Sequence, residues 1–454
     1  MLKFNIKLIS ILVLGMLIRV YGILVLSLGE WDERYHALVA KNLIKTPLHP
    51  YLIADKILHL DANDWTLCEI WLAKPPLAFW FMSLSMKVFG ENEFGLRFPS
   101  LIFSTLSIYL TYLIGRKLYN ESVGLWAAFF YAVNGLLYEI NIGLLSGDHV
   151  DTLFHLLMQV AMHSMISQEN KSSLGANGLI VGALSGLAFL TKWTMSFFII
   201  AVCMLVFIYN KPQLKKTIVY AIGIFIGFTL ISTPWLIWIF ANFSDEANSI
   251  FNGVIAPVSI VIQGHSGYWY YYLNSIRINI NELIYLPLLF SAFITFKKQD
   301  AKRVFLAIWI FLPLILLSSF ETKREVYIMM SATPLFISMS YFINFISRRF
   351  YKNRKLVWFV KLIFILLAVR YSIERIKPQR PRLVKPDYRN EMESLLSKNN
   401  YIDSLVIIND PNYLDARFYY NLKAYPYLDE TKVANIKQQG FKIYECTDGK
   451  YLPK

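Results

Sequence analysis

The sequence predicts an all-α polytopic membrane protein that carries a small α/β domain outside the membrane at its C-terminal end. The chain of 454 residues is 56% hydrophobic and only 17% charged, whereas soluble globular domains carry about 25% charged residues. Apolar runs of a length near that needed to cross the hydrocarbon core, about 20 residues of helix, recur along residues 1–372. The tail 373–454 is polar by contrast and reads as short strands and helices.

Eleven apolar segments are expected to cross the membrane. The first resembles a signal peptide in its basic start, but its apolar part is too long and no small-residue cleavage site follows it. It is therefore expected to stay as a span. The expected spans are 8–28, 98–115, 122–140, 150–167, 177–191, 193–210, 217–240, 282–296, 304–320, 326–346 and 356–371.

The distribution of basic residues predicts which loops lie outside. The net charge of +14 would suggest a nucleic-acid partner in a soluble protein, but here Lys and Arg gather in short loops between the apolar segments. By the positive-inside rule these loops are cytoplasmic, which places the N-terminus inside and the loops 29–97 and 241–281 outside. The segment 75–90 would reverse this pattern as a span, so it is expected to be an interfacial helix on the outer surface. Membrane lipids, and no nucleic acid, are the expected surroundings.

The tail 373–454 is expected to form a separate extracytoplasmic domain. A proline-rich linker at 377–389 precedes a strand in SLVIIND, a helix in YLDARFYYNL and a second strand in GFKIYEC. About 80 residues can form a small α/β domain. The three cysteines of the chain, Cys68, Cys203 and Cys446, follow no metal-binding spacing.

Two acidic clusters fall on the predicted outer face. Asp32 and Glu33 follow the first span, and Asp148 and Asp151 stand where an outer loop enters a later span. Acids in the first turn of a helix also favour the helix dipole or act as caps. Because two clusters far apart in sequence reach the same face, a joint role is the alternative, in which they orient an acceptor, take its proton or hold a metal.

Basic and aromatic residues also gather on that face. Lys74 precedes two prolines, Lys192 interrupts an apolar stretch, and Lys323 and Arg324 stand in an outer turn. A lone interfacial lysine usually extends to lipid headgroups, whereas several together favour a phosphate pocket. The aromatic run 263–272 is typical of an interfacial belt, and it could also form a platform for a sugar.

Several short motifs occur in a characteristic order: Asp32-Glu33, Lys74-Pro75-Pro76-Leu77, Phe89-Gly90-Glu91 followed by Arg97, Asp151 with Leu153, Thr191-Lys192-Trp193, His265 with Tyr271, and Lys323 through Tyr327 to Pro334. This order resembles the membrane glycosyltransferases of the C-type fold. The closest resemblance is to the branch that contains the lipid A aminoarabinose transferases and the protein O-mannosyltransferases. Those aminoarabinose transferases commonly show Asp-Glu-x-Arg-Tyr, whereas Tyr35 and His36 take the last two places here, so the resemblance leaves open whether lipid A and aminoarabinose are the specific substrates.

The resemblance implies a C-type fold in residues 1–372, with about eleven transmembrane helices plus interfacial helices. It also implies a polyprenyl-phosphate-linked sugar donor and an active site on the periplasmic side of a bacterial inner membrane. By the same resemblance, Asp32 with its neighbour Glu33, and Asp151 with Asp148 as the alternative, are the expected catalytic acids. Lys74 and Lys192, with Lys323 and Arg324, are expected to hold the carrier phosphate. The expected substrate contacts are His36, Arg97, His265, Tyr271 and Tyr327.

The implied reaction is displacement at the anomeric carbon, with transfer to a lipid, glycan or protein acceptor. Lysines would stabilise the leaving phosphate. Asp32 would act as general base for a hydroxyl acceptor, or would orient an acceptor phosphate that is already ionised. No nucleotide cofactor is expected, and a divalent metal at the acidic site stays open. Two alternatives remain: a polyprenyl-linked glycan flippase or polymerase, which would more often show repeated halves or charges buried within spans, and a non-catalytic scaffold whose acids are helix caps.

Overall fold

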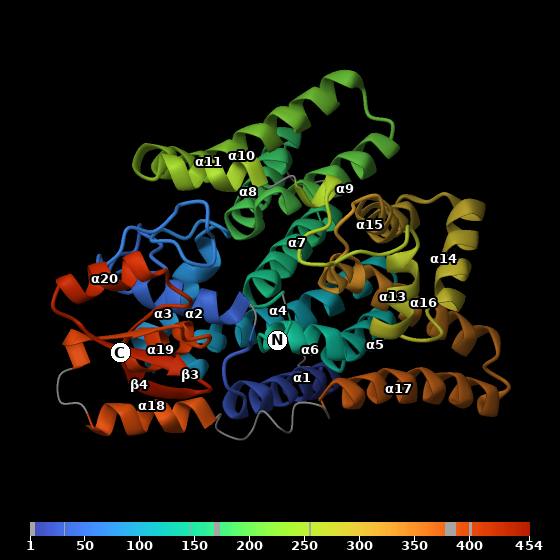
Figure 1. Ribbon diagram of the computed structural model, residues 1–454. Coiled ribbons are helices and arrows are strands. Elements are labelled where there is room, and N and C mark those ends of the chain that lie inside the picture. Colours follow the sequence, from blue (N-terminus) through green and yellow to red (C-terminus); the bar gives the residue numbers. More distant parts are fainter. Residues whose placement is uncertain are drawn as a thin grey trace.

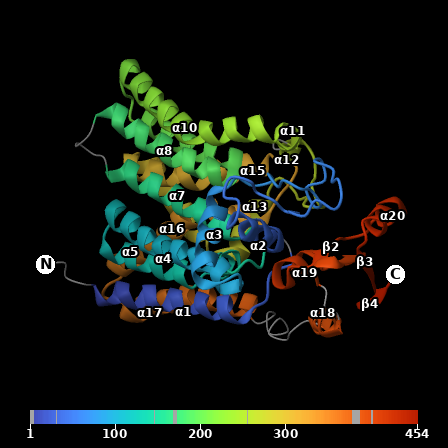
Figure 2. The same ribbon diagram turned by 90° about the vertical axis from the view of Figure 1, so that its left-hand side faces the viewer.

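The computed structural model describes residues 5–30, 32–145, 147–167, 173–253, 256–376, 387–398 and 402–454. Figure 1 shows a large helical bundle and, beside it, a smaller unit of strands and helices formed by the C-terminal residues. In Figure 2 this C-terminal unit lies at one end of the bundle, and the first helix, α1, starts toward the opposite end. The predicted combination of an all-α membrane region with a small C-terminal α/β unit is confirmed.

The first half of the chain builds part of the bundle and one long segment without helices. Its helices are α1 (Ile6–Val25), α2 (Asp32–Leu43), α3 (Leu77–Phe89), α4 (Glu93–Leu118), α5 (Glu121–Ala132), α6 (Gly135–Asn141) and α7 (His149–Ser167). The segment 44–76 between α2 and α3 holds no helix and only an isolated bridge between Tyr51 and Ile70. The helices α2 and α3 and this long segment lie together at the end of the bundle that carries the C-terminal unit (Figure 2).

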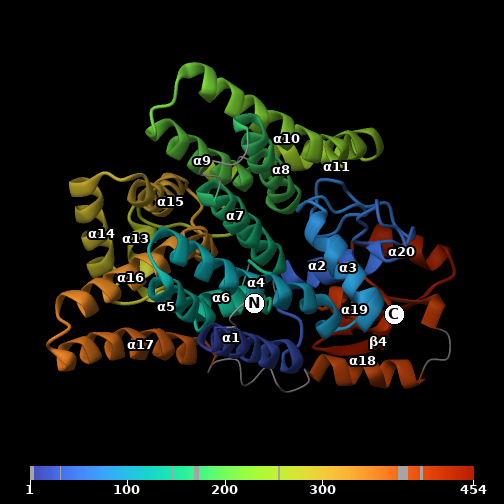
Figure 3. The same ribbon diagram turned by 180° about the vertical axis from the view of Figure 1, so that it is seen from behind.

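The second half of the chain completes the bundle. Its helices are α8 (Leu174–Lys192), η1 (Trp193–Ser196), α9 (Phe197–Tyr209), α10 (Leu214–Asn242), α11 (Ser244–Gly253), α12 (Ala256–Ser259), α13 (Tyr271–Asn279), α14 (Tyr285–Lys298), α15 (Ala301–Ser318), η2 (Glu325–Ile328), α16 (Met329–Arg349) and α17 (Arg354–Ile376). Figure 3 shows α8, α9 and α10 on one side of the bundle, and α1 and α17 on the other.

The chain is a multi-pass membrane protein. In the described part of the chain, seven helical segments are long and apolar enough to cross a membrane, or eight if the bent pair α5 and α6 is one span. A helix or helix pair overlaps each of the eleven segments expected from the sequence, but the count of eleven stays a prediction. The interfacial position of 75–90 also stays a prediction, although this segment does form the short apolar helix α3.

Helices α8 and α10 run in the same direction and pack with their backbones close together. A Cβ atom added at Gly178 would lie 2.3 Å from the carbonyl oxygen of Tyr220, and one at Gly186 would lie 3.0 Å from that of Phe228. Because α8 and α10 are parallel, the helix that connects them, α9, must run antiparallel to both. The chain reverses at Trp193, whose φ of 37° ends α8, so the continuous helical segment 174–209 supplies two antiparallel helices. This reversal puts Lys192 at the end of α8.

The C-terminal unit is a four-stranded sheet with helices. Its strands are β1 (Leu405–Ile408), β2 (Lys423–Ala424), β3 (Lys442–Thr447) and β4 (Lys450–Pro453), in the order β2-β1-β3-β4. Strand β1 pairs in parallel with β2 and β3, and β4 pairs antiparallel to β3. The helices are α18 (Asp387–Lys398), α19 (Tyr413–Tyr420) and α20 (Glu430–Gln438), with the short turn η4 (Ile402–Ser404).

The three elements expected in the tail coincide with β1, α19 and β3, whereas β2, β4, α18 and α20 were not expected. Helix α17 continues to Ile376, past the expected boundary at 372. Most of the expected linker, residues 377–386, lies outside the described residues. The core of the C-terminal unit is shared with the membrane domain, because one cluster of buried apolar side chains joins α2, the segment 44–76 and β1. The unit is therefore packed against the end of the bundle that carries α2 and the segment 44–76.

Candidate active site

A cavity of about 370 Å³ opens at the end of the bundle that faces the C-terminal unit. Its walls come from several regions of the chain: Asp32, the segment 62–74, the reversal at 192–195, helix α11, and the stretches 257–263 and 322–327. Five residues singled out from the sequence lie in its lining, and they are Asp32, Lys74, Lys192, Arg324 and Tyr327. The fold therefore brings together side chains that are up to 295 positions apart in the sequence (327 minus 32).

Asp32 is the first residue of α2 and faces Lys74. The Lys74 Nζ lies 3.9 Å from Asp32 Oδ2, and the two side chains are 25% and 21% exposed. A carboxylate in the first turn of a helix is favoured by the free N–H groups there, which explains why the sequence places an acid at this position. Because both side chains keep exposed surface inside the cavity, a substrate can reach them.

Lys192 and Asp151 form the second pair of opposite charges. The Lys192 ammonium bonds Asp151 Oδ1 and lies 4.9 Å from the centre of the Tyr327 ring. The Lys192 and Asp151 side chains are only 10% and 4% exposed. A cation that is partly removed from water is stabilised by such partners. Lys192 can therefore present a fixed positive charge to the cavity, and Asp151 reaches the cavity only through this lysine.

Glu33 lies behind Asp32 and has no exposed surface. Arg97 donates two hydrogen bonds to its carboxylate, at 2.7 and 2.8 Å, and His149 Nε2 lies 2.8 Å from Oε1. Burial opposes the charge of Glu33, but Arg97 and His149 hold the pKa of this carboxyl below its usual value. Arg97 also donates to the carbonyl oxygens of Leu26 and Ser27, so Glu33 and Arg97 tie α2 to α4 and to the end of the first helix.

His36 and Asp148 form another buried pair. His36 Nδ1 hydrogen bonds Asp148 Oδ2, and each side chain is 1% exposed. Burial raises the pKa of Asp148 but His36 more than offsets it, so the pKa lies below the usual value. The His36 ring packs 5.4 Å from the ring of Trp71, which lines the cavity. The structure thus puts both residues behind the cavity wall and not on its surface.

The remaining expected residues come from the stretch 263–271 and the turn before η2, and only some of them line the cavity. Arg324 donates to Gln263 Oε1 at 2.8 Å, and both line the cavity. Lys323 is buried and donates to the carbonyl oxygen of Phe320, so its ammonium points away from the lining. The backbone carbonyl of His265 accepts from the Lys323 N–H at 2.8 Å.

The His265 imidazole is half-buried and lies within electrostatic reach of both Arg324 and Asp32. Burial and Arg324 lower its pKa, which Asp32 partly offsets. Tyr271 packs edge-on against Tyr272, 5.0 Å between ring centres, and neither His265 nor Tyr271 belongs to the lining.

Several lining residues were not expected from the sequence. Glu246 and Ser249 of α11 and Asn63, Trp65 and Trp71 of the outer loop contribute to the cavity. No motif surrounds these residues, and only the fold brings them to the other walls. Trp65 is 38% exposed and provides a flat apolar surface of the kind that packs against sugar rings, whereas Trp71 is only 3% exposed.

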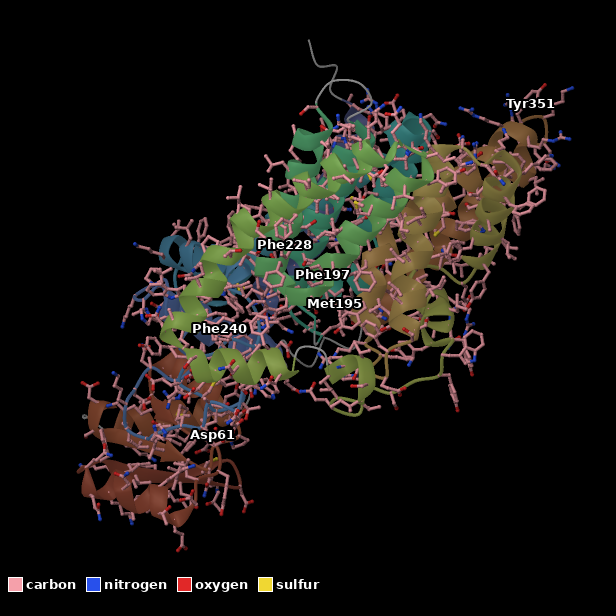
Figure 4. All side chains as sticks on the ribbon, turned by 90° about the horizontal axis from the view of Figure 1, so that it is seen from above. Asp61, Met195, Phe197, Phe228, Phe240 and Tyr351 are labelled. Atoms are coloured by element: carbon pink, nitrogen blue, oxygen red, sulfur yellow. The ribbon has the colours of Figure 1, made fainter. Side chains whose placement is uncertain are left out.

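An apolar groove of about 300 Å³ continues from the cavity between α9 and α15. It shares Thr194, Met195 and Pro257 with the cavity. Its other lining residues are Phe197, Phe198, Ala201, Val258, Leu316 and Phe320. Figure 4 shows Met195 and Phe197 close together beside the α9 and α10 ribbons, and Phe197 lies 5.7 Å from Phe228 between ring centres. A hydrocarbon chain could occupy this groove while a polar head lies in the cavity.

The acids of the site do not fit a divalent metal. Within the described ranges, no three His, Cys, Asp or Glu side chains are arranged to hold a metal ion. Asp32 faces Lys74, and Asp151 is paired with Lys192, so an ammonium group already stands at each carboxylate. No step of the chemistry is assigned to a metal.

Known proteins resemble this chain both in sequence and in fold. The sequence profile of the family described as dolichyl-phosphate-mannose-protein mannosyltransferase matches residues 73–238. The undecaprenyl phosphate-alpha-4-amino-4-deoxy-L-arabinose arabinosyl transferase of Pseudomonas aeruginosa (strain LESB58) is 27% identical over 290 residues, which are 62% of this chain and 52% of the relative. A second transferase of that name, from Pseudomonas fluorescens (strain Pf0-1), is 22% identical over 390 residues, covering 85% of this chain and 68% of the relative. The chain thus spans about half the length of the first relatives that it matches.

Solved structures extend the match to nearly the whole chain. ArnT from Cupriavidus metallidurans bound to undecaprenyl phosphate superposes with a TM-score of 0.68 at 13% identity, covering 95% of this chain and 87% of that protein. The chain has the C-type fold of the membrane glycosyltransferases. The oligosaccharyltransferase of Archaeoglobus fulgidus shares this C-type fold with a TM-score of 0.60 at 14% identity, covering 97% of this chain and 69% of that protein.

Proposed function

We propose that this chain transfers a sugar from a polyprenyl-phosphate carrier to a lipid, glycan or protein acceptor at the outer face of the membrane. The observation that carries the proposal is the cavity in which the exposed carboxylate of Asp32 lies with the cations Lys74, Lys192 and Arg324. The apolar groove that opens from this cavity supports a donor with a long hydrocarbon tail.

The positive groups suit a phosphate that gains charge as it leaves. In the proposed reaction the acceptor oxygen forms a bond to the anomeric carbon while the bond between that carbon and the carrier phosphate breaks. Fixed cations stabilise the developing charge without reorganisation, which is the largest catalytic contribution in many enzymes. Lys74, Lys192 and Arg324 are the groups proposed to do this, and a compact ammonium or a guanidinium can each bind a phosphate oxygen.

Asp32 is the proposed catalytic residue. If the acceptor is a hydroxyl, Asp32 takes its proton as the new bond forms. If the acceptor is a phosphate, it is ionised at neutral pH, and Asp32 orients it through Lys74 or a hydrogen-bonding group. Lys74 lies 3.9 Å from Asp32 Oδ2, so it stabilises the ionised carboxylate that can accept a proton.

The expected catalytic acids Glu33, Asp148 and Asp151 receive different proposed roles. Each is nearly or fully buried and already engaged: Glu33 with Arg97, Asp148 with His36 and Asp151 with Lys192. Glu33 and Asp148 are proposed to position α2, and Asp151 is proposed to position and charge Lys192. In these roles the buried acids contribute to the reaction only indirectly. Removing one of them would leave its partner as an unpaired buried charge, which is strongly destabilising.

The names of the relatives support a lipid-linked donor and leave the sugar open. The relatives in Pseudomonas are named as aminoarabinose transferases that use undecaprenyl phosphate, and the family profile is described by dolichyl-phosphate-mannose. A bacterial inner membrane and a periplasmic active site are the corresponding proposals for this chain. The predicted positive-inside topology, with 29–97 and 241–281 outside, agrees with a site at that end of the bundle.

A transfer assay with purified protein tests the proposal. The donor is a radiolabelled polyprenyl-phosphate sugar in detergent, and the readouts are label on an added acceptor lipid, glycan or peptide and release of free polyprenyl phosphate. Wild type should release the carrier, and Asp32→Asn should not. A flippase would move labelled lipid between leaflets of a vesicle without breaking the sugar–phosphate bond, and a scaffold would do neither. Movement without bond cleavage, or no reaction across a panel of donors and acceptors, would refute the proposal.

A further inference from the structure

The helix that follows β1, α19, makes an unusual number of polar contacts outside its own domain. Arg34 of α2 pairs with Asp415 at 3.2 Å between Nε and Oδ1, and its Nη1 donates to Asn412. Lys41 of α2 donates to the carbonyl oxygen of Phe418. Helix α19 therefore contacts α2 near both of its ends, through Arg34 and Lys41. The first residue of α2 is Asp32.

The same helix also holds the outer segment that forms one wall of the cavity. The Tyr413 hydroxyl donates to the carbonyl oxygen of Thr66, and it is in hydrogen-bond contact with the Tyr35 hydroxyl. Arg417 forms an ion pair with Asp55 in the same segment. Thr66 is next to Trp65, a lining residue, so a side chain of the C-terminal domain is one residue away from the cavity surface.

Two different faces of α2 contact the cavity and helix α19. Asp32 and Arg34 are two positions apart, which places them about 200° apart around a helix with 3.6 residues per turn. Asp32 faces the cavity, whereas Arg34 faces α19 with a side chain that is 15% exposed. A displacement of α19 would be transmitted to Asp32 through a rigid helix, and to Trp65 through Tyr35, whose ring lies 5.3 Å from the Trp65 ring.

We infer that the C-terminal domain is a brace for the active site: Tyr413 and the Arg34–Asp415 pair position α2 and the outer cavity wall, so that the Asp32 carboxylate and the wall face the bound donor correctly. Tyr413, Arg34 and Asp415 are positioning residues, since none of them lines the cavity. The inference rests on the proposed function for its catalytic consequence, but its structural part does not.

A native cysteine provides a structural readout that needs no activity. Cys68 lies in the cavity wall, two residues after Thr66, and is 2% exposed. Burial, with Asp64 and Glu246 nearby, raises the pKa of its thiol to about 12. A thiol of this kind reacts slowly because the thiolate is the reactive form. In a background with Cys203→Ala and Cys446→Ser, labelling of Cys68 by a soluble maleimide therefore reports whether the wall is closed.

The first test compares Tyr413→Phe with Tyr427→Phe. Each change removes one phenolic hydroxyl from the C-terminal domain. The Tyr413 hydroxyl donates to the carbonyl oxygen of Thr66 in the cavity wall, whereas the Tyr427 side chain is 80% exposed. Tyr413→Phe should raise the Cys68 labelling rate and lower kcat by about fivefold, the effect of losing one hydrogen bond. Binding of polyprenyl phosphate should stay within about twofold, and Tyr427→Phe should match wild type in every measurement.

The second test is a cycle of Arg34→Met, Asp415→Asn and the double variant. If the pair transmits the position of α19, the double variant should label no faster than the faster single variant, because coupled residues are not additive. Unchanged labelling in Tyr413→Phe, or additive effects in the cycle, would overturn the brace. If Cys68 is labelled faster in Tyr413→Phe but kcat is unchanged, then the contact of Tyr413 holds the wall closed but does not position the active site. If wild type transfers no sugar from any donor, the proposed function fails while the labelling result still decides whether the brace exists.

Discussion

Replacing Lys192 by methionine separates the two tasks that the structure assigns to this lysine. Methionine keeps an unbranched apolar stem but removes the ammonium that bonds Asp151 and lies over the Tyr327 ring. Two losses should follow: a phosphate contact in the cavity, and the partner of a carboxylate that is only 4% exposed.

The magnitudes of the two losses differ. A charge-assisted contact to a phosphate contributes roughly 1.5–3 kcal/mol, which is about a ten- to hundredfold change in affinity for polyprenyl phosphate. Leaving the buried Asp151 carboxylate unpaired should cost about 3–5 kcal/mol of folding stability. The second loss can be repaired without the first, because Asp151→Leu in the Lys192→Met background removes the orphaned charge.

The assay measures carrier affinity and thermal unfolding of the single and the double variant in detergent. Lys192→Met should unfold at a lower temperature and bind the carrier weakly. The double variant should recover most of the unfolding temperature but bind the carrier as weakly as the single variant. Lys215→Met is the matched control, because Lys215 is an exposed lysine in the first turn of α10 and does not line the cavity. Wild-type carrier affinity in the double variant would refute the phosphate role of Lys192.

Three further predictions follow from other parts of the molecule. Asp32→Asn should lower kcat by about 10²–10⁴-fold, as expected for loss of a general base, while a thermal-shift titration still detects polyprenyl phosphate binding; near wild-type turnover would support a capping role instead. Burial raises the pKa of Asp410 to about 6, above its unfolded value of about 3.9, so its burial favours folding at low pH and this contribution is lost as pH rises toward 6. Protection factors of the β1 amides, in which the intrinsic pH dependence of hydrogen exchange is divided out, should then be larger at pH 5 than at pH 7.5, and Asp410→Asn, which keeps an acceptor for the Asn412 N–H, should abolish this difference in protection; an equal difference in the variant would contradict the assignment. In single-cysteine labelling of intact cells, positions 88 and 440 should react from outside and position 213 should not; labelling of 213 would reject the predicted topology.

Much of the fold could be read from local sequence. Transmembrane helices need long apolar runs because no water is present to satisfy the backbone, so such runs located the long helices of the bundle but not the short α11, α12 and α13, which lie in the expected loop 241–281. The tail was recognisable by its loss of those runs, and β1, α19 and β3 followed from apolar stretches bounded by turn residues. The reversal at Trp193 was expected only as a junction between two segments. Its left-handed backbone conformation was visible only in the structure.

The candidate site, like the fold, could be predicted from the sequence only in part. The order of short motifs located Asp32, Lys74, Lys192, Arg324 and Tyr327, and the structure brings these residues into one cavity. Local sequence could not separate residues that face the cavity from neighbours that face the protein interior. Adjacent positions on a helix point in different directions, so Asp32 lines the cavity while the next residue, Glu33, is fully buried.

The sequence by itself determined that this chain crosses a membrane many times and which of its loops are basic, and it predicted which acids and lysines approach the outer face. These properties depend on composition and on spacing along the chain. Only the tertiary structure decided which charges pair, that Glu246 and two tryptophans join the cavity, and that α19 contacts α2. Arg34 and Asp415 are 381 positions apart (415 minus 34), and contacts at such separation depend on how the helices pack, because no local preference of either segment specifies its distant partner.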